Sequence, residues 1–281
     1  ILAGISIILV KSIRMEIERR EQVTELAKSL ETANVRLKEL DGLKTEFLSI
    51  ASHQLRTPLS IIKGYGELLK DGAYGKMAPP AIEVLDNIDL SNERLIRMVD
   101  EFLNVSRIEQ GRTQYSFADT DIVAMIRGVV GELNEKAMPS EITLKLEGVD
   151  TKCAIQADEE KLRHCVYNFV DNAIKYSPKK SVIRILIEHK RKDMAVRVID
   201  SGVGLDKKDI DNLFQKFYRS PHVIQDFQGT GLGLFVVKQF VEAHGGRVWA
   251  KSAGVGHGSE FGFTVPIKKG RSRYRGLKPR Q

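Results

Sequence analysis

The pattern of apolar positions changes once along the chain, from a helical period in the first part to strand-like patterns in the second. Between residues 12 and 47, apolar residues recur at alternating intervals of three and four, which is a heptad pattern. We interpret this segment as a parallel coiled coil that acts as a signalling helix or a plain spacer. The stripe consists of Val23, Leu26, Leu30, Ala33, Leu37 and Leu40.

Two more helices are predicted over residues 44–70 and 81–109, on either side of a glycine-rich segment at 71–75. The second of them has a heptad stripe in which polar Asn92 and Ser106 occupy seam positions. One hairpin buries two such stripes poorly, whereas two hairpins bury them in a four-helix bundle. We therefore expect a homodimer.

After Gly111 the sequence predicts an α/β domain that begins near 111–118 and ends near Ile267. Eleven of the 23 glycines fall between Gly202 and Gly262, so this part should carry tight turns and close backbone contacts. Strands are predicted at 142–146, 182–187, 194–199, 247–250 and 261–265, and helices at 121–136, 158–175 and 231–244.

Charge and composition narrow the functional classes. The chain of 281 residues has a formal charge of +7, but seven basic residues without an acidic one lie in the segment 268–281. Residues 1–267 are therefore neutral, which argues against a nucleic-acid surface spread over the fold. We expect the basic segment to be a disordered tail. Two cysteines without a CxxC spacing favour a reducing compartment.

The apolar segment Ile1–Val10 is followed directly by Lys11 and Arg14. This order predicts the cytoplasmic end of a transmembrane helix, with the rest of the chain facing the cytoplasm. The alternative is an amphipathic or disordered start.

The first candidate for chemistry is the segment Phe47–Pro58, which contains His53. His53 is two residues from Ala51 and Leu55 of the apolar stripe, so it should face solvent on the opposite side of the helix. Thr57 shares its face. An exposed neutral imidazole is a competent nucleophile, although most surface histidines are inert.

The α/β part has its own candidate segments. Asn168 and Asn172 lie one turn apart on a predicted helix, and oxygen ligands beside the ammonium of Lys175 suit Mg²⁺ and phosphates. A plain polar helix face is an equally good interpretation of that set alone. Asp200 follows a predicted strand and precedes two glycines, which is common in turns.

A second glycine-rich segment, 229–233, opens a predicted helix without the spacing of a P-loop or a Rossmann fingerprint. Between the two glycine segments, Phe214 and Phe217 are suited to anchor a segment over a nucleotide, and Arg219 to reach a terminal phosphate. A small satellite core with a solvated arginine is the alternative.

In this order, the segments resemble the sensor histidine kinases of two-component signalling over residues 12–267. His53–Pro58 resembles the phospho-acceptor box of that family, and the four later segments resemble the boxes of its ATP-binding domain. The resemblance implies an α + α/β fold: a coiled coil and a helical hairpin forming a dimeric four-helix bundle, followed by an α/β sandwich ATP-binding domain with a mixed sheet. The implied domains are a truncated transmembrane end at 1–10, a signalling helix at 11–43, a phosphotransfer hairpin at 44–112, the ATP-binding domain at 113–267 and the tail at 268–281.

The resemblance also implies the chemistry. ATP and Mg²⁺ are the implied cofactors, with Asn172, helped by Asn168, as the metal ligand. Asp200 would accept a hydrogen bond from the adenine amino group, and Arg219 would stabilise charge on the transferred phosphoryl group. Residues 205–228 would form a lid. The implied nucleotide-binding residues are Asn168, Asn172, Lys175, Tyr176, Asp200, Gly202, Gly204, Phe217, Gly229, Thr230, Gly231, Leu232 and Gly233.

The resemblance further implies that His53 takes the phosphoryl group of ATP and passes it to an aspartate on a response regulator. The implied partners are therefore the response regulator, a second copy of the chain and the membrane. The family most often has Glu or Asp after the histidine, whereas this chain has Gln54, which accepts a hydrogen bond but not a proton. Thr57 matches the position that orients water for dephosphorylation of the regulator. Glu260 stands where the closing strand motif usually has a small polar residue.

Two other functions compete with this one. An ATPase of the gyrase, chaperone or anti-sigma kinase type would share the nucleotide-binding segments. Those families, however, lack a box like the one around His53. A non-catalytic scaffold would keep the ATP fold and signal through its dimer. Every nucleotide-contacting position is filled by a competent residue, which favours the kinase.

Overall fold

The structure is a computed structural model that describes residues 2–148, 153–190, 192–222 and 229–267. Its description excludes the side chains of residues 2–13, 38, 41, 44–49, 52 and 53. The chain forms two compact units, residues 1–92 and 93–281. The predicted basic tail at 268–281 and the end of the predicted lid, 223–228, lie outside the described residues.

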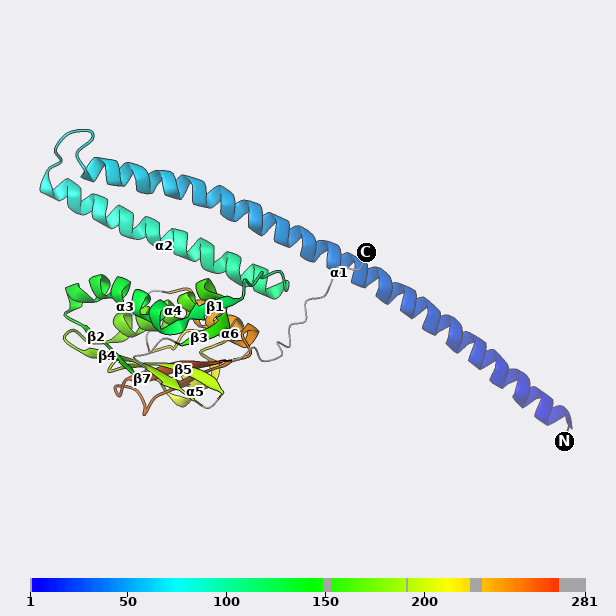
Figure 1. The fold of residues 1–281 in the computed structure, drawn as a ribbon. Coiled ribbons are helices and arrows are strands. Elements are labelled where there is room, and N and C mark those ends of the chain that lie inside the picture. Colours follow the sequence, from blue (N-terminus) through cyan, green and yellow to red (C-terminus); the bar gives the residue numbers. More distant parts are fainter. Residues whose placement is uncertain (1, 149–152, 191, 223–228, 268–281) are drawn as a thin grey trace. The chain divides into compact units, whose positions relative to one another are not determined.

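The first unit contains α1 (Leu2–Lys70) and the beginning of α2 (Pro79–Glu109), which form a helical hairpin (Figure 1). The sequence predicts one helical segment over 12–47 and another over 44–70, whereas α1 is a single continuous helix that passes through Gly42 and Pro58. A glycine costs a helix only about 1 kcal/mol. Pro58 removes one backbone hydrogen bond, the one to the carbonyl of Gln54, without ending the helix.

Polar contacts join the two helices of the hairpin. Asn92 is buried, as its seam position predicts, and its Nδ2 donates to the carbonyl of Leu59 at 2.8 Å. Near the connection, the Lys70 ammonium lies 2.6 Å from Asp86 and 2.5 Å from Asp89, and these hydrogen bonds raise the pKa of Lys70. Among the described residues, no helix is both long and apolar enough to cross a membrane.

The second unit is built on a five-stranded mixed sheet in the order β2-β4-β5-β7-β6. β2 runs parallel to β4, and the other neighbouring pairs are antiparallel. All five predicted strands are confirmed: β2 (Thr143–Gly148), β4 (Val182–His189), β5 (Asp193–Asp200), β6 (Arg247–Lys251) and β7 (Ser259–Pro266).

Helices cover one face of this sheet (Figure 1). The helix α3 packs on β2, α4 on β4 and β5, and α6 on β6 and β7. The three predicted helices are confirmed within two residues at each end, as α3 (Ile122–Ala137), α4 (Glu159–Tyr176) and α6 (Gly233–Ala243). The apolar faces of sheet and helices form one core around Phe169, Phe240 and Phe263.

Four short elements were not predicted. β1 (Ala118–Asp121) pairs with β3 (Ala154–Ala157) in a separate two-stranded sheet. The turn η1 (Met138–Ser140) follows α3, and α5 (Lys207–Asn212) follows β5 and the loop after it. α5 begins with a capping box in which Asp206 and Asp209 each bind the other's backbone N–H.

Residues on the outer face of the sheet form a ladder of charges. Arg197 lies between Glu188, at 2.8 Å, and Glu260, at 2.6 Å, and Trp249 donates its indole N–H to Glu260 at 2.8 Å. These contacts lower the pKa of Glu260, although its partial burial works in the opposite direction. Glu260, which departs from the pattern of the family, thus ties β5, β6 and β7 together.

Candidate nucleotide-binding and phospho-acceptor sites

The polar side of α4 carries the predicted phosphate and metal ligands. The opposite side of the helix, which includes Leu162, Val166 and Phe169, is fully buried in the core and fixes the rotation of the helix. Asn168 and Asn172 are half-buried on the polar side, and Nδ2 of Asn172 donates to Oδ1 of Asn168 at 3.1 Å. This hydrogen bond leaves the Oδ1 atom of Asn172 as an oxygen ligand.

The start of α6 lies directly against Asn168. A Cβ atom on Gly233 would fall 2.3 Å from the Nδ2 atom of Asn168, so a larger residue there would displace the Asn168 side chain. Gly229 lies beside Lys175, because a Cβ atom on Gly229 would be 3.4 Å from the Lys175 ammonium. The structure thus brings the two most distant predicted boxes, 168–176 and 229–233, to one place.

Asp200 ends β5 inside the same region and is buried. Its Oδ1 atom accepts hydrogen bonds from the backbone N–H of Gly202 at 2.7 Å and of Ser259 at 3.2 Å. Burial raises the pKa of this carboxyl group, while the two backbone bonds work against that rise. Both bonds use Oδ1, so Oδ2 remains to accept a hydrogen bond from a ligand.

The loop after Asp200 packs against the end of α4. A Cβ atom on Gly202 would lie 2.5 Å from the carbonyl oxygen of Tyr176, and the N–H of Val203 donates to that carbonyl at 3.3 Å. Gly204 has a φ of 69° and faces the backbone of Gly254. Both predicted glycines are therefore required by close backbone contacts.

A second loop that supports Asp200 was not assigned a role from the sequence. Gly256 donates its N–H to Val203 at 2.7 Å, and Gly258 donates to Gly202 at 3.1 Å. Ser252 accepts from the N–H of Leu205 and donates to the carbonyl of Gly258. The signal that was available is the closely spaced glycines at 254, 256 and 258.

Cationic side chains gather beside α4. Burial lowers the pKa of the Lys175 ammonium, and the positive charge of Arg219 lowers it further. Arg219 also opposes the rise that burial causes in the pKa of Tyr176. The charge of Arg219 thus acts on both residues, and two cations that repel each other in a half-buried site are suited to a polyphosphate.

The predicted aromatic pair is divided between two environments. Phe214 packs against the core, whereas Phe217 is 64% exposed with a φ of 61°, and its N–H donates to the carbonyl of Gly231 at 3.0 Å. Gly231 itself has a φ of 72°. Phe217 thus joins the segment before residue 223 to the glycine-rich loop.

Thr230 and Leu232 complete that loop, and they connect it to a residue that no motif in the sequence marks. Leu232 is buried, and its N–H donates to Oγ1 of Thr230 at 3.2 Å. The hydroxyl of Thr230 donates to the carboxylate of Glu101, on the part of α2 that belongs to the second unit. Burial raises the pKa of Glu101, and the bond from Thr230 lowers it.

The residues present fit a nucleotide with Mg²⁺. Within the described part of the chain, no three His, Cys, Asp or Glu side chains cluster as a metal site. Mg²⁺ does not need such a cage, since it is commonly held by one or two protein oxygens together with substrate phosphates. The Oδ1 atom of Asn172 supplies such an oxygen, and the glycine loop leaves space that a Cβ atom would fill.

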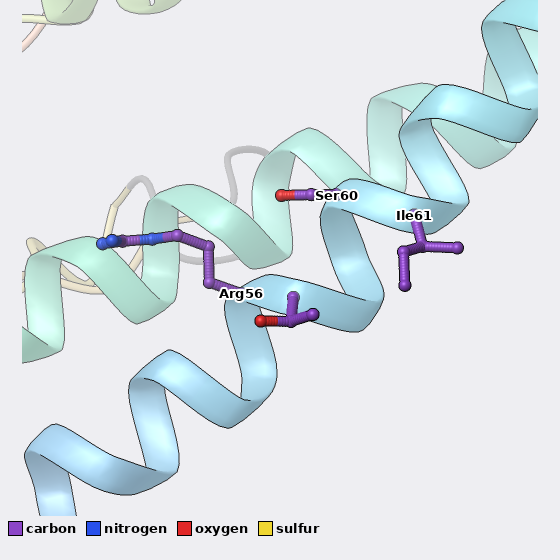
Figure 2. A pocket seen from close by; sticks show the side chains of 4 residues that line it. Arg56, Ser60 and Ile61 are labelled. Carbon is purple, nitrogen blue, oxygen red and sulfur yellow. The ribbon is translucent and has the colours of Figure 1, made fainter.

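The phospho-acceptor segment lies in the other unit. His53 is part of α1, but its side chain is outside the described ones, so its expected solvent-facing orientation stays a prediction. Gln54 and Thr57 are exposed. A hollow of about 380 Å³ opens on α1 beside Arg56, Thr57, Ser60 and Ile61. Figure 2 shows Arg56 and Ser60, one turn apart, projecting from this part of α1.

Two family models match the chain and together cover more than half of it. Residues 43–111 match the His Kinase A (phospho-acceptor) domain, and residues 157–269 match the histidine kinase-, DNA gyrase B- and HSP90-like ATPase. A hairpin with an acceptor histidine followed by an ATP-binding α/β sandwich defines a protein histidine kinase. The chain belongs to the sensor histidine kinases of two-component systems.

Relatives agree with this assignment. The chain is 29% identical to the sensor histidine kinase WalK of Bacillus subtilis over 92% of its own length and 45% of that protein. It is 30% identical to the circadian input-output histidine kinase CikA of Synechococcus elongatus over 89% of its own length and 32% of that protein. The chain thus spans less than half of either relative.

Solved structures show the same fold. Full-length ShkA in complex with AMPPNP superimposes with a TM-score of 0.65 and 26% identity, over 79% of this chain and 45% of that one. The catalytic domain of the histidine kinase ThkA superimposes with a TM-score of 0.50 and 26% identity, over 55% of this chain and 97% of that one. The predicted order of a helical hairpin followed by an α/β ATP-binding domain with a mixed sheet is confirmed.

Proposed function

We propose that the chain transfers the γ-phosphoryl group of ATP to His53 and then to an aspartate on the receiver domain of a response regulator. The observation that carries this proposal is the convergence, in one unit, of Asn168, Asn172, Lys175, Arg219 and the buried carboxylate of Asp200. The carboxylate of Asp200 is a hydrogen-bond acceptor suited to the adenine of ATP, and the cations Lys175 and Arg219 are suited to its phosphates. The box around His53 supplies a nucleophile.

In the proposed site, Oδ2 of Asp200 accepts a hydrogen bond from the adenine amino group, and Tyr176 lies beside the nucleotide. Gly202 and Gly204 allow the loop after Asp200 to turn tightly against α4. Lys175 and Arg219 bind phosphate oxygens, and the backbone of residues 229–233 lies along the phosphates. Asn172, helped by Asn168, would ligate Mg²⁺, which supplies charge neutralisation between phosphates when bound. Phe217 borders the nucleotide.

At the acceptor, Nε2 of neutral His53 attacks the γ-phosphorus while the bond from that phosphorus to the bridging oxygen breaks, and ADP leaves with the electron pair. Gln54 holds Nδ1–H through its amide oxygen and fixes the tautomer that leaves Nε2 free to react. Because an amide does not accept the proton, that proton passes to water. The phosphoryl group later moves from Nε2 to the receiver carboxylate.

We further propose that the kinase is a homodimer. The heptad positions Leu26, Leu30 and Leu37 of α1 are 66–71% exposed in a single chain, which supports their burial against a second copy. The predicted membrane attachment at residues 1–10 is likewise a proposal, supported by the basic residues that follow the apolar segment. No segment of the proposed machinery requires nucleic acid.

The proposal is tested by incubation with γ-labelled ATP and Mg²⁺. A kinase acquires label that is acid-labile and base-stable, and both His53→Ala and Asn172→Ala abolish it. Nucleotide binding without any label would support the non-catalytic scaffold, and release of phosphate that does not depend on His53 would support an ATPase.

Thr57 is proposed to orient the water that dephosphorylates the receiver. It is exposed and lies one turn after His53, next to the hollow on α1. We expect Thr57→Ala to slow receiver dephosphorylation by about tenfold or more, because a positioned water is lost, while autophosphorylation changes less than about twofold. Thr57→Ser restores the hydroxyl and serves as the control. An equal loss of both activities would refute this role.

A further inference from the structure

Asp209 is an acidic residue with almost no contact with solvent. It belongs to the short helix α5, and only 1% of its surface is exposed. Its Oδ2 atom accepts from the N–H of Asp206 at 3.1 Å and from the hydroxyl of Ser220 at 2.9 Å. Its Oδ1 atom accepts from the hydroxyl of Tyr218 at 3.0 Å. A buried carboxylate is costly unless it is satisfied, and this one is satisfied by neutral donors.

The two hydroxyl donors come from the residues on either side of Arg219. Tyr218 and Ser220 are therefore both held at Asp209, and the backbone of Arg219 is fixed between them. The backbone just before Arg219 lies against the glycine-rich loop, because a Cβ atom on Gly231 would fall 2.8 Å from backbone atoms of Phe217 and Tyr218. The charge of Arg219 also acts on Lys175 and Tyr176. The same short segment thus contacts α5 on one side and the nucleotide site on the other.

The segment before Arg219 has an unfavourable backbone conformation. Phe217 has a φ of 61°, in the left-handed region, which costs a non-glycine residue about 1–2 kcal/mol. Its N–H is held by the carbonyl of Gly231. The hydrogen bonds from Tyr218 and Ser220 to Asp209 come directly after Phe217. They hold the chain in the direction that the left-handed conformation of Phe217 gives it.

We propose that Asp209 is a positioning residue that holds the guanidinium of Arg219 at the terminal phosphate of ATP. Asp209 does not touch the nucleotide and acts through Tyr218 and Ser220. This inference rests on the proposed ATP site, and it deepens that proposal by naming what orients its outermost cation.

The test compares the affinities for ATP and ADP in a His53→Ala background, so that no turnover occurs. ADP lacks the terminal phosphate, so a correctly held Arg219 makes ATP bind more tightly than ADP by roughly tenfold, the value of one charge-assisted hydrogen bond. We expect Asp209→Ala and Arg219→Ala each to remove this difference while ADP affinity changes less than about twofold. The double variant Asp209→Ala, Arg219→Ala should lose no more of the difference between ATP and ADP affinity than either single variant, because both changes remove the same contact.

Asp211, an exposed acidic residue on the same helix, provides the matched control, and Asp211→Ala should keep the full difference between ATP and ADP. If Asp209→Ala does not fold, the double variant Tyr218→Phe, Ser220→Ala removes the two flanking bonds and should give the same result. Asp209→Asn keeps one acceptor and should restore part of the difference.

Unchanged discrimination in these variants would overturn the inference, and so would an equal loss of ADP and ATP affinity, which marks a merely structural role. Failure of the proposed function gives a different result. In that case the chain with His53 intact acquires no label from ATP, whereas the comparison of ATP with ADP does not depend on labelling.

Discussion

At the scale of single residues, Asp200 combines burial with two backbone hydrogen bonds on one of its oxygens. Those bonds fix which oxygen faces the proposed adenine site. They also determine what an isosteric amide would do there. In Asp200→Asn the amide oxygen would take the place of Oδ1, and the NH₂ group would face the adenine amino group, donor against donor.

We therefore predict that Asp200→Asn weakens ATP binding by about 10- to 100-fold, the value of a buried hydrogen bond lost with its partner left unsatisfied. Calorimetric titration measures the change, and Ser201→Ala, at an exposed neighbouring position, is the control. The wild-type affinity should also fall as pH is lowered through the raised pKa of Asp200, because protonation removes the acceptor. The fall begins at a higher pH than for an ordinary aspartate. A variant that binds ATP as the wild type does would contradict this role.

Gln54 tests how the proton of His53 is handled. Gln54→Glu replaces an amide that only accepts a hydrogen bond by a carboxylate that also takes the proton. We expect a faster single-turnover autophosphorylation, by up to about 100-fold, the lower end of what a positioned base contributes. Gln54→Ala, which removes the acceptor, should be slower than the wild type. An unchanged or lower rate in Gln54→Glu would refute the base argument.

At the scale of elements, the glycine-rich loop 229–233 is shaped by unequal constraints. Gly231 has a φ of 72°, and a Cβ atom there would lie 2.8 Å from backbone atoms of Phe217 and Tyr218. Among the described residues, a Cβ atom on Gly229 would meet the flexible end of the Lys175 side chain, at 3.4 Å, and no backbone atom. The two positions are alike in sequence and differ in structure.

We predict that Gly231→Ala lowers the free energy of unfolding by at least about 1–2 kcal/mol, because of its left-handed backbone, and by more through the contact with Phe217. Gly229→Ala should change it by less than about 0.5 kcal/mol. Chemical denaturation of the nucleotide-free protein measures both values. Equal effects at the two positions would contradict the geometry of the loop.

The elements differ in how well the sequence predicts them. Long apolar or alternating segments such as 182–187 identify their strands, and heptad stripes identify the helices, because burial imposes a period on the chain. β1 has the sequence Ala-Asp-Thr-Asp, which shows no apolar alternation, and within the described residues it pairs with β3 in a two-stranded sheet. Nothing in its pattern marks a strand. The helix predicted over 44–70 does pass through Pro58, since a long helix tolerates one missing hydrogen bond, but its fusion with the preceding helical segment into one helix is not marked by the sequence pattern.

The site shows the same division. Motifs predict the nucleotide-binding roles of Asn172, Lys175 and Asp200, because those roles depend on residue type and spacing. Glu101 and the role of Asp209 were not, because both depend on contacts between segments far apart or on burial of a carboxylate. A motif marks candidate ligand-binding residues, whereas the residues that hold them in place are found only in the fold.

At the scale of the whole molecule, the proposed parallel coiled coil brings the same residue of two copies together at every heptad position. Leu37 lies on the predicted seam, and Val35 lies two residues away on the opposite side of the helix. Both are exposed in the single chain, by 66% and 53% respectively. The proposed dimer distinguishes them, because it buries Leu37 at the seam and leaves Val35 exposed.

We predict that Leu37→Cys forms an intermolecular disulfide under mild oxidation, whereas Val35→Cys forms little or none. Non-reducing electrophoresis provides the measurement. The native thiols should interfere little, since burial raises the pKa of both Cys153 and Cys165 and makes them poor nucleophiles. Equal crosslinking at the two positions, or none at either, would contradict the parallel coiled coil.

The central claim is that ATP bound by the unit of residues 93–281 phosphorylates His53 in the unit of residues 1–92. Peptide mapping at alkaline pH after incubation with ATP and Mg²⁺ tests it most directly, because phosphohistidine survives those conditions. The account predicts phosphate on the peptide that carries His53, and its absence from that peptide in Asn172→Ala. Phosphate on a serine, on another histidine, or on His53 irrespective of Asn172 would contradict it.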